Sequence, residues 1–152
     1  MIIPYGKQSI DQDDIDLVVE VLKSDFLTQG PYITEFEDSY SKFVGAKYAV
    51  AVSNGTAALH LAVLALGLEY GDNIITTPIT FAASGNCAKF VGANVYFADI
   101  DAETGLIDYG SVKSLVESKP KGFFAGLIAV SFAGLPLRLK PFRELADKRG
   151  FG

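Results

Sequence analysis

The sequence predicts an α/β fold in which a mostly parallel sheet carries helices on both faces. Segments typical of strands and of helices take turns from residue 46 to the end of the chain. The strand-like segments lack polar alternate positions, which is typical of strands covered on both sides by helices. The chain has 152 residues, 49% of them apolar, which is enough to bury a core. We therefore expect a helical segment over residues 1–45 and a sheet-containing domain over residues 46–152.

Two helices are expected in the first segment. The run Ser9–Gln12 has the pattern of a capping box, so the first helix is expected to begin there and to end near Ser24. One face of this helix is expected to be buried, because apolar residues recur at helical spacing at Ile15, Val18, Val19 and Leu22. Gly30-Pro31 marks a loop. A second helix is then expected from about Ile33 until Gly45 ends it, with one side formed by Phe36, Tyr40 and Phe43.

The second segment alternates between strands and helices. The short apolar run Tyr48–Val52 is expected to be a strand. The helix after it is apolar on nearly all sides, so we expect several of its sides to be covered. From this helix onward, the expected elements are helix 57–66, strand 73–77, helix 81–90, strand 94–98, helix 109–117, strand 123–130 and helix 139–148. The last helix ends in Arg149–Gly152, as a helix does before another strand, so the sheet is expected to be incomplete at its C-terminal end.

Composition and charge disfavour several classes of function. The chain carries 13 Lys and Arg against 18 Asp and Glu, and the cations are scattered, which argues against nucleic acid as a partner. The uncharged stretch at residues 122–137 is too short and too interrupted by glycine and proline to span a membrane. The N-terminus lacks the pattern of a secretory signal, so a cytoplasmic location is expected.

The single cysteine and the single histidine allow neither an intrachain disulfide nor a Cys/His zinc set. Cys87 is expected to be a small buried apolar residue. His60 lies in an apolar helix without a neighbouring carboxylate, so a core or interface histidine is favoured over a general base. The acidic run Asp99–Glu103 lacks the spacing of a calcium loop, so a solvated turn is favoured over a cation site. No metal site is expected.

The segment Ser53–Ala57 is the first of three candidate ligand-binding segments. It joins a predicted strand to a helix, at the carboxyl edge where α/β sheets bind ligands. The first amides of a helix have no internal partner and favour a phosphate or another anion. Gly55 would let a ligand approach the backbone, and the Thr56 hydroxyl can donate a further hydrogen bond. The alternative is that Ser53 or Asn54 simply caps the helix.

The other two candidate segments also lie between predicted elements. In Thr76–Phe81, Pro78 ends a strand and Phe81 begins a helix on the ligand side of the sheet. The Phe81 ring could stack there on a flat heteroaromatic ligand, although the same residue could belong to the core. Leu27–Gly30 is a polar, glycine-bearing loop between two helices, and the alternative is a mere connecting turn.

In this order and spacing, the three segments resemble the N-terminal part of the sugar aminotransferases of the DegT/DnrJ/EryC1/StrS family, which are pyridoxal-phosphate enzymes of fold type I. The likeness covers essentially the whole chain, and its matching segments are Leu27–Pro31, Ala51–His60, Thr76–Phe81, Val95–Asp101 and Phe132–Pro136. It is strongest to the branch that aminates C4 of a UDP-linked 4-keto-6-deoxy-N-acetylhexosamine in the route to pseudaminic acid. The resemblance implies that residues 46–152 are part of a large domain that binds pyridoxal phosphate.

The resemblance also implies roles for individual residues. It implies that the phosphate of pyridoxal phosphate is held by Gly55, Thr56 and Ala57, and that its pyridine ring stacks on Phe81. It implies a nucleotide-sugar site at a homodimer interface, beside Thr28, Gln29 and Gly30.

The chemistry of the resembled family needs two further groups. One is a Lys that bonds covalently to the cofactor, and the other is an Asp that keeps the pyridine nitrogen protonated. The resemblance places both beyond Gly152, so no catalytic residue is expected in this chain. None of the ten lysines matches the required position, including Lys89, Lys140 and Lys148. The chain also departs from the family at Leu137-Arg138, where an acidic residue is common, and at Ser131, where His is frequent.

The resulting hypothesis is the N-terminal portion of an aminotransferase that moves an amino group, from glutamate, to a 4-keto-6-deoxy nucleotide sugar. The 152 residues alone are expected to be inactive. The alternative is a non-catalytic α/β module that binds a phosphorylated ligand at Ser53–Ala57 or assembles through exposed apolar surface.

Overall fold

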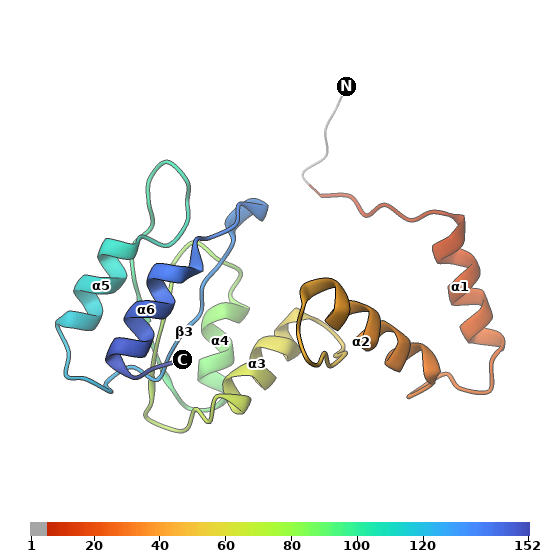
Figure 1. Cartoon of the computed structure of the whole chain (residues 1–152), viewed down its shortest axis with the longest axis horizontal. Coiled ribbons are helices and arrows are strands. Elements are labelled where there is room, and N and C mark those ends of the chain that lie inside the picture. Colours follow the sequence, from red (N-terminus) through yellow and green to blue (C-terminus); the bar gives the residue numbers. More distant parts are fainter. Residues whose placement is uncertain (1–5) are drawn as a thin grey trace. The chain divides into compact units, whose positions relative to one another are not determined.

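The computed structural model describes residues 6–152, which belong to two compact units (Figure 1). The first unit ends at Ala51, and the second comprises Val52–Gly152. The first holds helices α1 (Gln12–Lys23) and α2 (Pro31–Val44). None of the helices within the described residues has both the length and the apolar character needed to cross a bilayer.

Helix α1 begins two residues later than the pattern at Ser9 indicates. Its N-cap is Asp11, whose Oδ1 accepts hydrogen bonds from the Asp13 and Asp14 amides at 3.0 and 3.1 Å. The Asp14 carboxylate accepts the Asp11 amide in return at 3.1 Å. The capping box predicted at Ser9–Gln12 is therefore wrong in register, because an aspartate caps at least as well as a serine and Asp11 completes the reciprocal pair.

Helix α2 also begins two residues away from its predicted start, this time earlier. Pro31 occupies the first turn, where its missing amide costs no hydrogen bond and its fixed φ suits a helix. The predicted end is confirmed, since Gly45 is the C-cap in the left-handed conformation with φ of 70°. The two helices are linked by one hydrogen bond, which the Tyr32 hydroxyl donates to Glu20 Oε1 at 2.6 Å. This bond raises the pKa of Tyr32 above its ordinary value.

The apolar face of α1 is not buried, contrary to its periodic pattern. Ile15 is 47% exposed and Leu22 is 65% exposed, and no residue of α1 is buried. The aromatic side of α2 is likewise exposed, and it comprises Phe36, Tyr40 and Phe43. Periodicity predicted the faces correctly, but it carries no information about whether a neighbouring element covers them.

The second unit contains three strands, four α-helices and one 3₁₀ turn. In chain order they are α3 (Gly55–Ala65), β1 (Asn73–Thr76), α4 (Ala83–Phe90), β2 (Asn94–Phe97), α5 (Tyr109–Glu117), β3 (Gly126–Leu127), η1 (Phe132–Gly134) and α6 (Leu139–Arg149). The predicted order of helices and strands is thus confirmed from α3 onward. The predicted strand at 48–52 is wrong: its residues pair with no strand among residues 6–152, and Tyr48 and Val50 are largely exposed.

The three strands form a parallel sheet with β1 in the centre, in the order β2-β1-β3. Asn73 is in register with Asn94 on one side, and Ile74 with Gly126 on the other. The predicted parallel sheet is confirmed. Strand β3 is shorter than predicted, since only Gly126 and Leu127 pair with β1.

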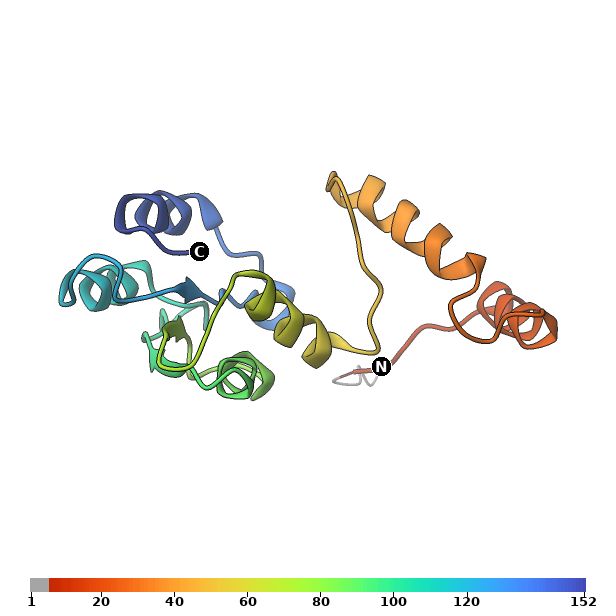
Figure 2. The ribbon, with the colours of Figure 1, turned by 90° about the horizontal axis from the view of Figure 1, so that it is seen from below.

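Helices cover both faces of this sheet, as predicted (Figure 2). Neighbouring residues of a strand point to opposite faces, so Ile74 and Ile75 enter different cores. The Ile74 core is shared with α3 and α4 and includes Val63, Leu68, Cys87, Ala88 and Ala93. The Ile75 core is shared with α5 and α6 and includes Val112, Val116, Phe124, Phe142 and Leu145.

Helix α3 is covered less than its composition indicates. Val63 is its only buried residue, at 2% exposure, whereas Leu61 and Leu64 are each about half exposed. The expectation that several sides of this helix are covered is therefore wrong for the second unit taken by itself, where α3 packs against α4.

Two asparagine side chains connect the starts of the strands. Asn73 Nδ2 donates to the Phe123 carbonyl at 3.0 Å, and Asn94 Nδ2 donates to Asn73 Oδ1 at 3.2 Å.

Near the C-terminus, the Gly152 amide donates to the Ala125 carbonyl at 3.0 Å, and the Leu127 amide donates to the Gly152 carbonyl at 2.8 Å. Gly152 therefore pairs with β3 as a residue of a parallel strand does.

We predict that Asn73→Ala lowers the free energy of unfolding by about 1–2 kcal/mol, because it leaves the Phe123 carbonyl without this donor. Urea denaturation followed by circular dichroism measures the effect. Asn94→Ala is the matched control and should cost less, since Asn94 is exposed and its amide reaches only the Asn73 side chain and the Gly71 carbonyl. Equal losses of stability for both variants would contradict the view that the hydrogen bond from Asn73 to the Phe123 carbonyl stabilises the start of the sheet.

Candidate functional site

The candidate site of the second unit lies at the carboxyl edge of the sheet. Strand β1 ends there at Thr76, and the chain continues through residues 77–82 into α4. The start of α3 belongs to the same edge, because the end of α3 leads through residues 66–72 into the start of β1. The topology therefore brings the predicted segments Ser53–Ala57 and Thr76–Phe81 to one edge, where α/β sheets bind ligands.

The start of α3 is both capped and partly open. Asn54 is the N-cap, and its side-chain Oδ1 accepts the Ala57 amide at 2.9 Å. The Ala58 amide donates to the Asn54 carbonyl at 3.1 Å, as the first bond of the helix. The amides of Gly55 and Thr56 precede this first turn and have no acceptor within the helix. The capping interpretation is thus confirmed for Asn54, and two amides remain available to an anion.

The backbone at Gly55 is accessible from outside the chain. Gly55 is exposed, and a Cβ placed on it would meet no atom of the protein within 4 Å. Its φ is not in the left-handed region, so neither the conformation nor the packing of this chain requires glycine here. A ligand could therefore approach these amides directly, and a side chain at this position would stand in its way.

Phe81 is exposed, so its interpretation as a core residue is wrong. Its side chain is 77% exposed at the point where the chain leaves β1. The backbone before it is fixed by buried threonines: Thr76 Oγ1 donates to the Ile128 carbonyl at 3.2 Å, and Thr77 Oγ1 accepts the Ile79 amide at 3.3 Å. An exposed ring on an anchored segment is available to stack on a flat ligand.

The third predicted segment belongs to the first unit, whereas the other two belong to the second. Thr28, Gln29 and Gly30 form a tight turn before α2, in which Gln29 has a positive φ of 54°. A Cβ on Gly30 would come within 2.9 Å of the Phe26 Cβ, so close packing inside the turn accounts for this glycine. The glycine is explained without any ligand.

The remaining sequence candidates have structural roles. Cys87 is fully buried, and burial raises the pKa of its thiol. His60 is half-buried and packs edge-on against Phe90, with 5.1 Å between ring centroids. Asp101 Oδ1 accepts the hydroxyl and the amide of Thr104, both at 2.8 Å, which lowers the pKa of this carboxyl. Among residues 6–152, no group of three or more His, Cys, Asp or Glu side chains could hold a metal ion.

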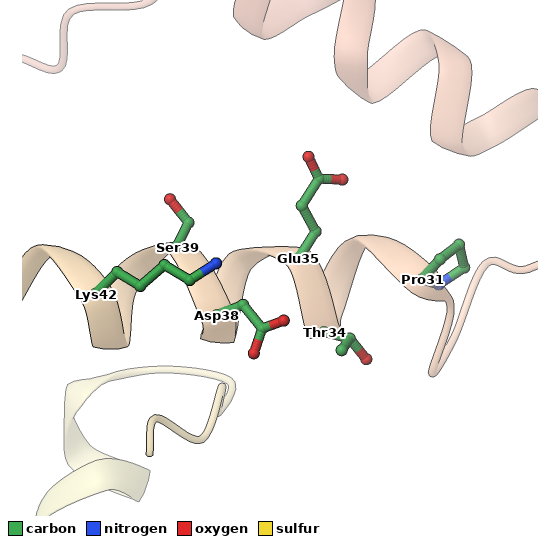
Figure 3. A pocket seen from close by; sticks show the side chains of 6 residues that line it. All are labelled: Pro31, Thr34, Glu35, Asp38, Ser39 and Lys42. Atoms are coloured by element: carbon green, nitrogen blue, oxygen red, sulfur yellow. The ribbon is translucent and has the colours of Figure 1, made fainter. Parts of the chain in front are cut away.

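The structure also contains a surface pocket that the sequence did not predict. It lies on α2 alone and is lined by Pro31, Thr34, Glu35, Asp38, Ser39 and Lys42 (Figure 3). All six residues come from one helix surface, so no second element converges on a ligand there. No sequence signal marks this hollow, because its residues follow the ordinary polar pattern of an exposed helix.

We predict that Phe81→Ala changes the free energy of unfolding by less than about 0.5 kcal/mol, since the ring is exposed. Phe124→Ala is the matched control: this ring is 3% exposed within the Ile75 core and should cost about 3–5 kcal/mol. Chemical denaturation of both variants gives the comparison. A large loss for Phe81→Ala would show that the ring packs in the folded chain and is not free for a ligand.

Known proteins resemble this chain over nearly its whole length. The chain is 37% identical over 148 residues to the spore coat polysaccharide biosynthesis protein SpsC of Bacillus subtilis, covering 97% of this chain and 37% of that protein. The PLP form of the putative sugar aminotransferase Spr1654 from Streptococcus pneumoniae superposes with a TM-score of 0.86 at 28% identity, over 96% of this chain and 36% of that one. Helicobacter pylori PseC, an aminotransferase involved in the biosynthesis of pseudoaminic acid, superposes with a TM-score of 0.85 at 29% identity, over 97% and 39%.

These relatives are considerably longer than the 152 residues, which span little more than a third of their length. Residues 8–151 match the DegT/DnrJ/EryC1/StrS aminotransferase family. Because this match includes nearly every residue that the structure describes, the chain belongs to the DegT/DnrJ/EryC1/StrS aminotransferase family.

Proposed function

We propose that this chain is the N-terminal portion of a pyridoxal-phosphate-dependent aminotransferase. The observation that carries the proposal is the carboxyl edge of the sheet, where the open amides of Gly55 and Thr56 and the exposed Phe81 ring belong to one edge. The PLP form of Spr1654 supports the choice of cofactor. When bound, pyridoxal phosphate supplies an electron sink for amino-group transfer.

The residues present fit a phosphorylated, flat cofactor. A dianionic phosphate is stabilised by unpaired amides and by the positive end of the α3 dipole. We assign this contact to the Gly55 and Thr56 amides and the Thr56 hydroxyl, with Ala57 adjoining them. Phe81 would hold the ring by stacking on it and would exclude water from one of its faces. The chain's part in the reaction is therefore to bind and orient the cofactor.

The proposed substrates are a UDP-linked 4-keto-6-deoxy sugar and glutamate as the amino donor. The resemblance of Thr76–Phe81 to the pseudaminic-acid branch and the likeness to PseC support this class of sugar. We place the nucleotide-sugar contact at Thr28, Gln29 and Gly30, next to the partner subunit of a homodimer in the cytoplasm. The resemblance supports this placement.

We predict that Gly55→Ala weakens binding of pyridoxal phosphate at least tenfold, because the methyl group would occupy the space next to the amides. Stability should change by less than about 1 kcal/mol, since the new Cβ meets nothing in the chain and alanine favours a helix. Fluorescence titration and thermal unfolding measure the two effects. Gly85→Ala, on α4, is the matched control: its Cβ would make only an ordinary contact with Val95, and binding should not change. Unaltered binding by Gly55→Ala would refute the assigned phosphate site.

We further predict that the 152 residues alone show no transaminase turnover and form no stoichiometric lysine adduct with pyridoxal phosphate. The physical reason is position: Lys89 lies on α4, and Lys140 and Lys148 lie exposed on α6, none of them matching the cofactor-bonding lysine of the resembled family. Borohydride treatment followed by mass spectrometry of peptides tests this. Saturable binding without a reducible adduct is the expected result, and one uniquely labelled lysine would contradict the prediction.

A further inference from the structure

Ser84, on α4, makes two hydrogen bonds to the chain at Phe81. Its amide donates to the Phe81 carbonyl at 3.0 Å. Its hydroxyl lies 2.8 Å from the hydroxyl of Thr80, the residue directly before Phe81. Ser84 therefore contacts the ring-bearing residue through the backbone and the preceding residue through the side chain.

Ser84 is itself fixed by the interior of the second unit. It is 6% exposed, whereas Thr80 is half-buried and the Phe81 ring is 77% exposed. The Cys87 thiol donates to the Ser84 carbonyl at 3.3 Å, and Cys87 belongs to the Ile74 core. Hydrogen bonds in a buried environment are stronger than those that water can reach. The contacts thus lead from a core, through Ser84, to an exposed aromatic residue.

The start of α4 lacks the side-chain cap that commonly fixes the entry into a helix. Its N-cap is Ala82, which makes no side-chain hydrogen bond to the first turn. Before it, Thr77 Oγ1 accepts the Ile79 amide, and this bond ends one residue short of Thr80. The bond between the Thr80 and Ser84 hydroxyls is therefore the side-chain contact that closes the chain around Phe81.

We propose that Ser84 and Thr80 are positioning residues, whose paired hydroxyls hold the segment at Phe81 so that the exposed ring keeps one orientation toward a flat ligand. The inference rests on the proposed function and concerns how that site keeps its stacking ring in place. A side chain that is free to reorient loses this freedom when a ligand stacks on it, and ordering it beforehand avoids the cost. Loss of the hydroxyl pair should weaken binding about three- to tenfold.

The first test uses the full 152-residue chain without ligand and measures the backbone order parameter at Phe81 by ¹⁵N relaxation. Ser84→Ala and Thr80→Val each remove one hydroxyl of the pair, so the order parameter at Phe81 should fall. Thr80→Ser keeps the hydroxyl and should restore the original value. Ser118→Ala is the matched control, since it removes a serine hydroxyl that donates to the Leu115 carbonyl at the end of α5. It should change nothing at Phe81.

The second test measures binding of pyridoxal phosphate by fluorescence titration. Ser84→Ala should weaken binding about three- to tenfold. In a chain that already carries Phe81→Ala, the same substitution should change the affinity by less than about 1.5-fold, because the ring through which it acts is gone. A merely structural role of Ser84 would lower the affinity equally in both backgrounds.

The outcomes separate this inference from the proposed function. An unchanged order parameter at Phe81 in both hydroxyl variants overturns the positioning role and leaves the cofactor site standing. An equal loss of affinity with and without the Phe81 ring does the same. Lower order at Phe81, together with no binding of pyridoxal phosphate by the unsubstituted chain, overturns the proposed function and supports the hold of the hydroxyl pair on this segment.

Discussion

The structure of the second unit depends on the pairing of β1 with a parallel strand on each side. This pairing places Ile74 and Ile75 on opposite faces, and each becomes the centre of a separate apolar core. A strand with two buried faces cannot persist without helices on both of them, so the positions of α3 to α6 follow from the central strand. The asparagine contacts at the strand starts add a polar constraint on register at the amino edge.

The same pairing creates the candidate site at the opposite edge. Parallel strands all end on one side, so the connections that leave them gather there without any local signal for a ligand. Two features make this edge chemically distinct. The first amides of α3 lack an acceptor within the helix, and the Phe81 ring is exposed instead of packed in a core. Asn54 satisfies the Ala57 amide at this helix start, whereas the amides of Gly55 and Thr56 have no acceptor within the helix.

Much of this arrangement could be predicted from residues close in sequence. The order of helices and strands follows from their periods, and Gly45 ends its helix because glycine enters the left-handed conformation at little cost. The errors occurred where two local signals compete or where a remote partner decides. At the start of α1, both Ser9 and Asp11 are possible caps, and the structure shows Asp11 as the N-cap with Asp14 completing its box. The run Tyr48–Val52 has strand composition but no strand beside it within the described chain.

The sequence by itself therefore determined the α/β class, the parallel sheet, the faces of the helices and the membership of an aminotransferase family. Only the tertiary structure decided that Phe81 faces solvent and that the faces of α1 and α2 are left open within the first unit. The physical reason is the separation in sequence between the residues that make each contact. Caps and periods arise from contacts within a turn or two of the chain, whereas burial is set by elements that arrive from tens of residues away.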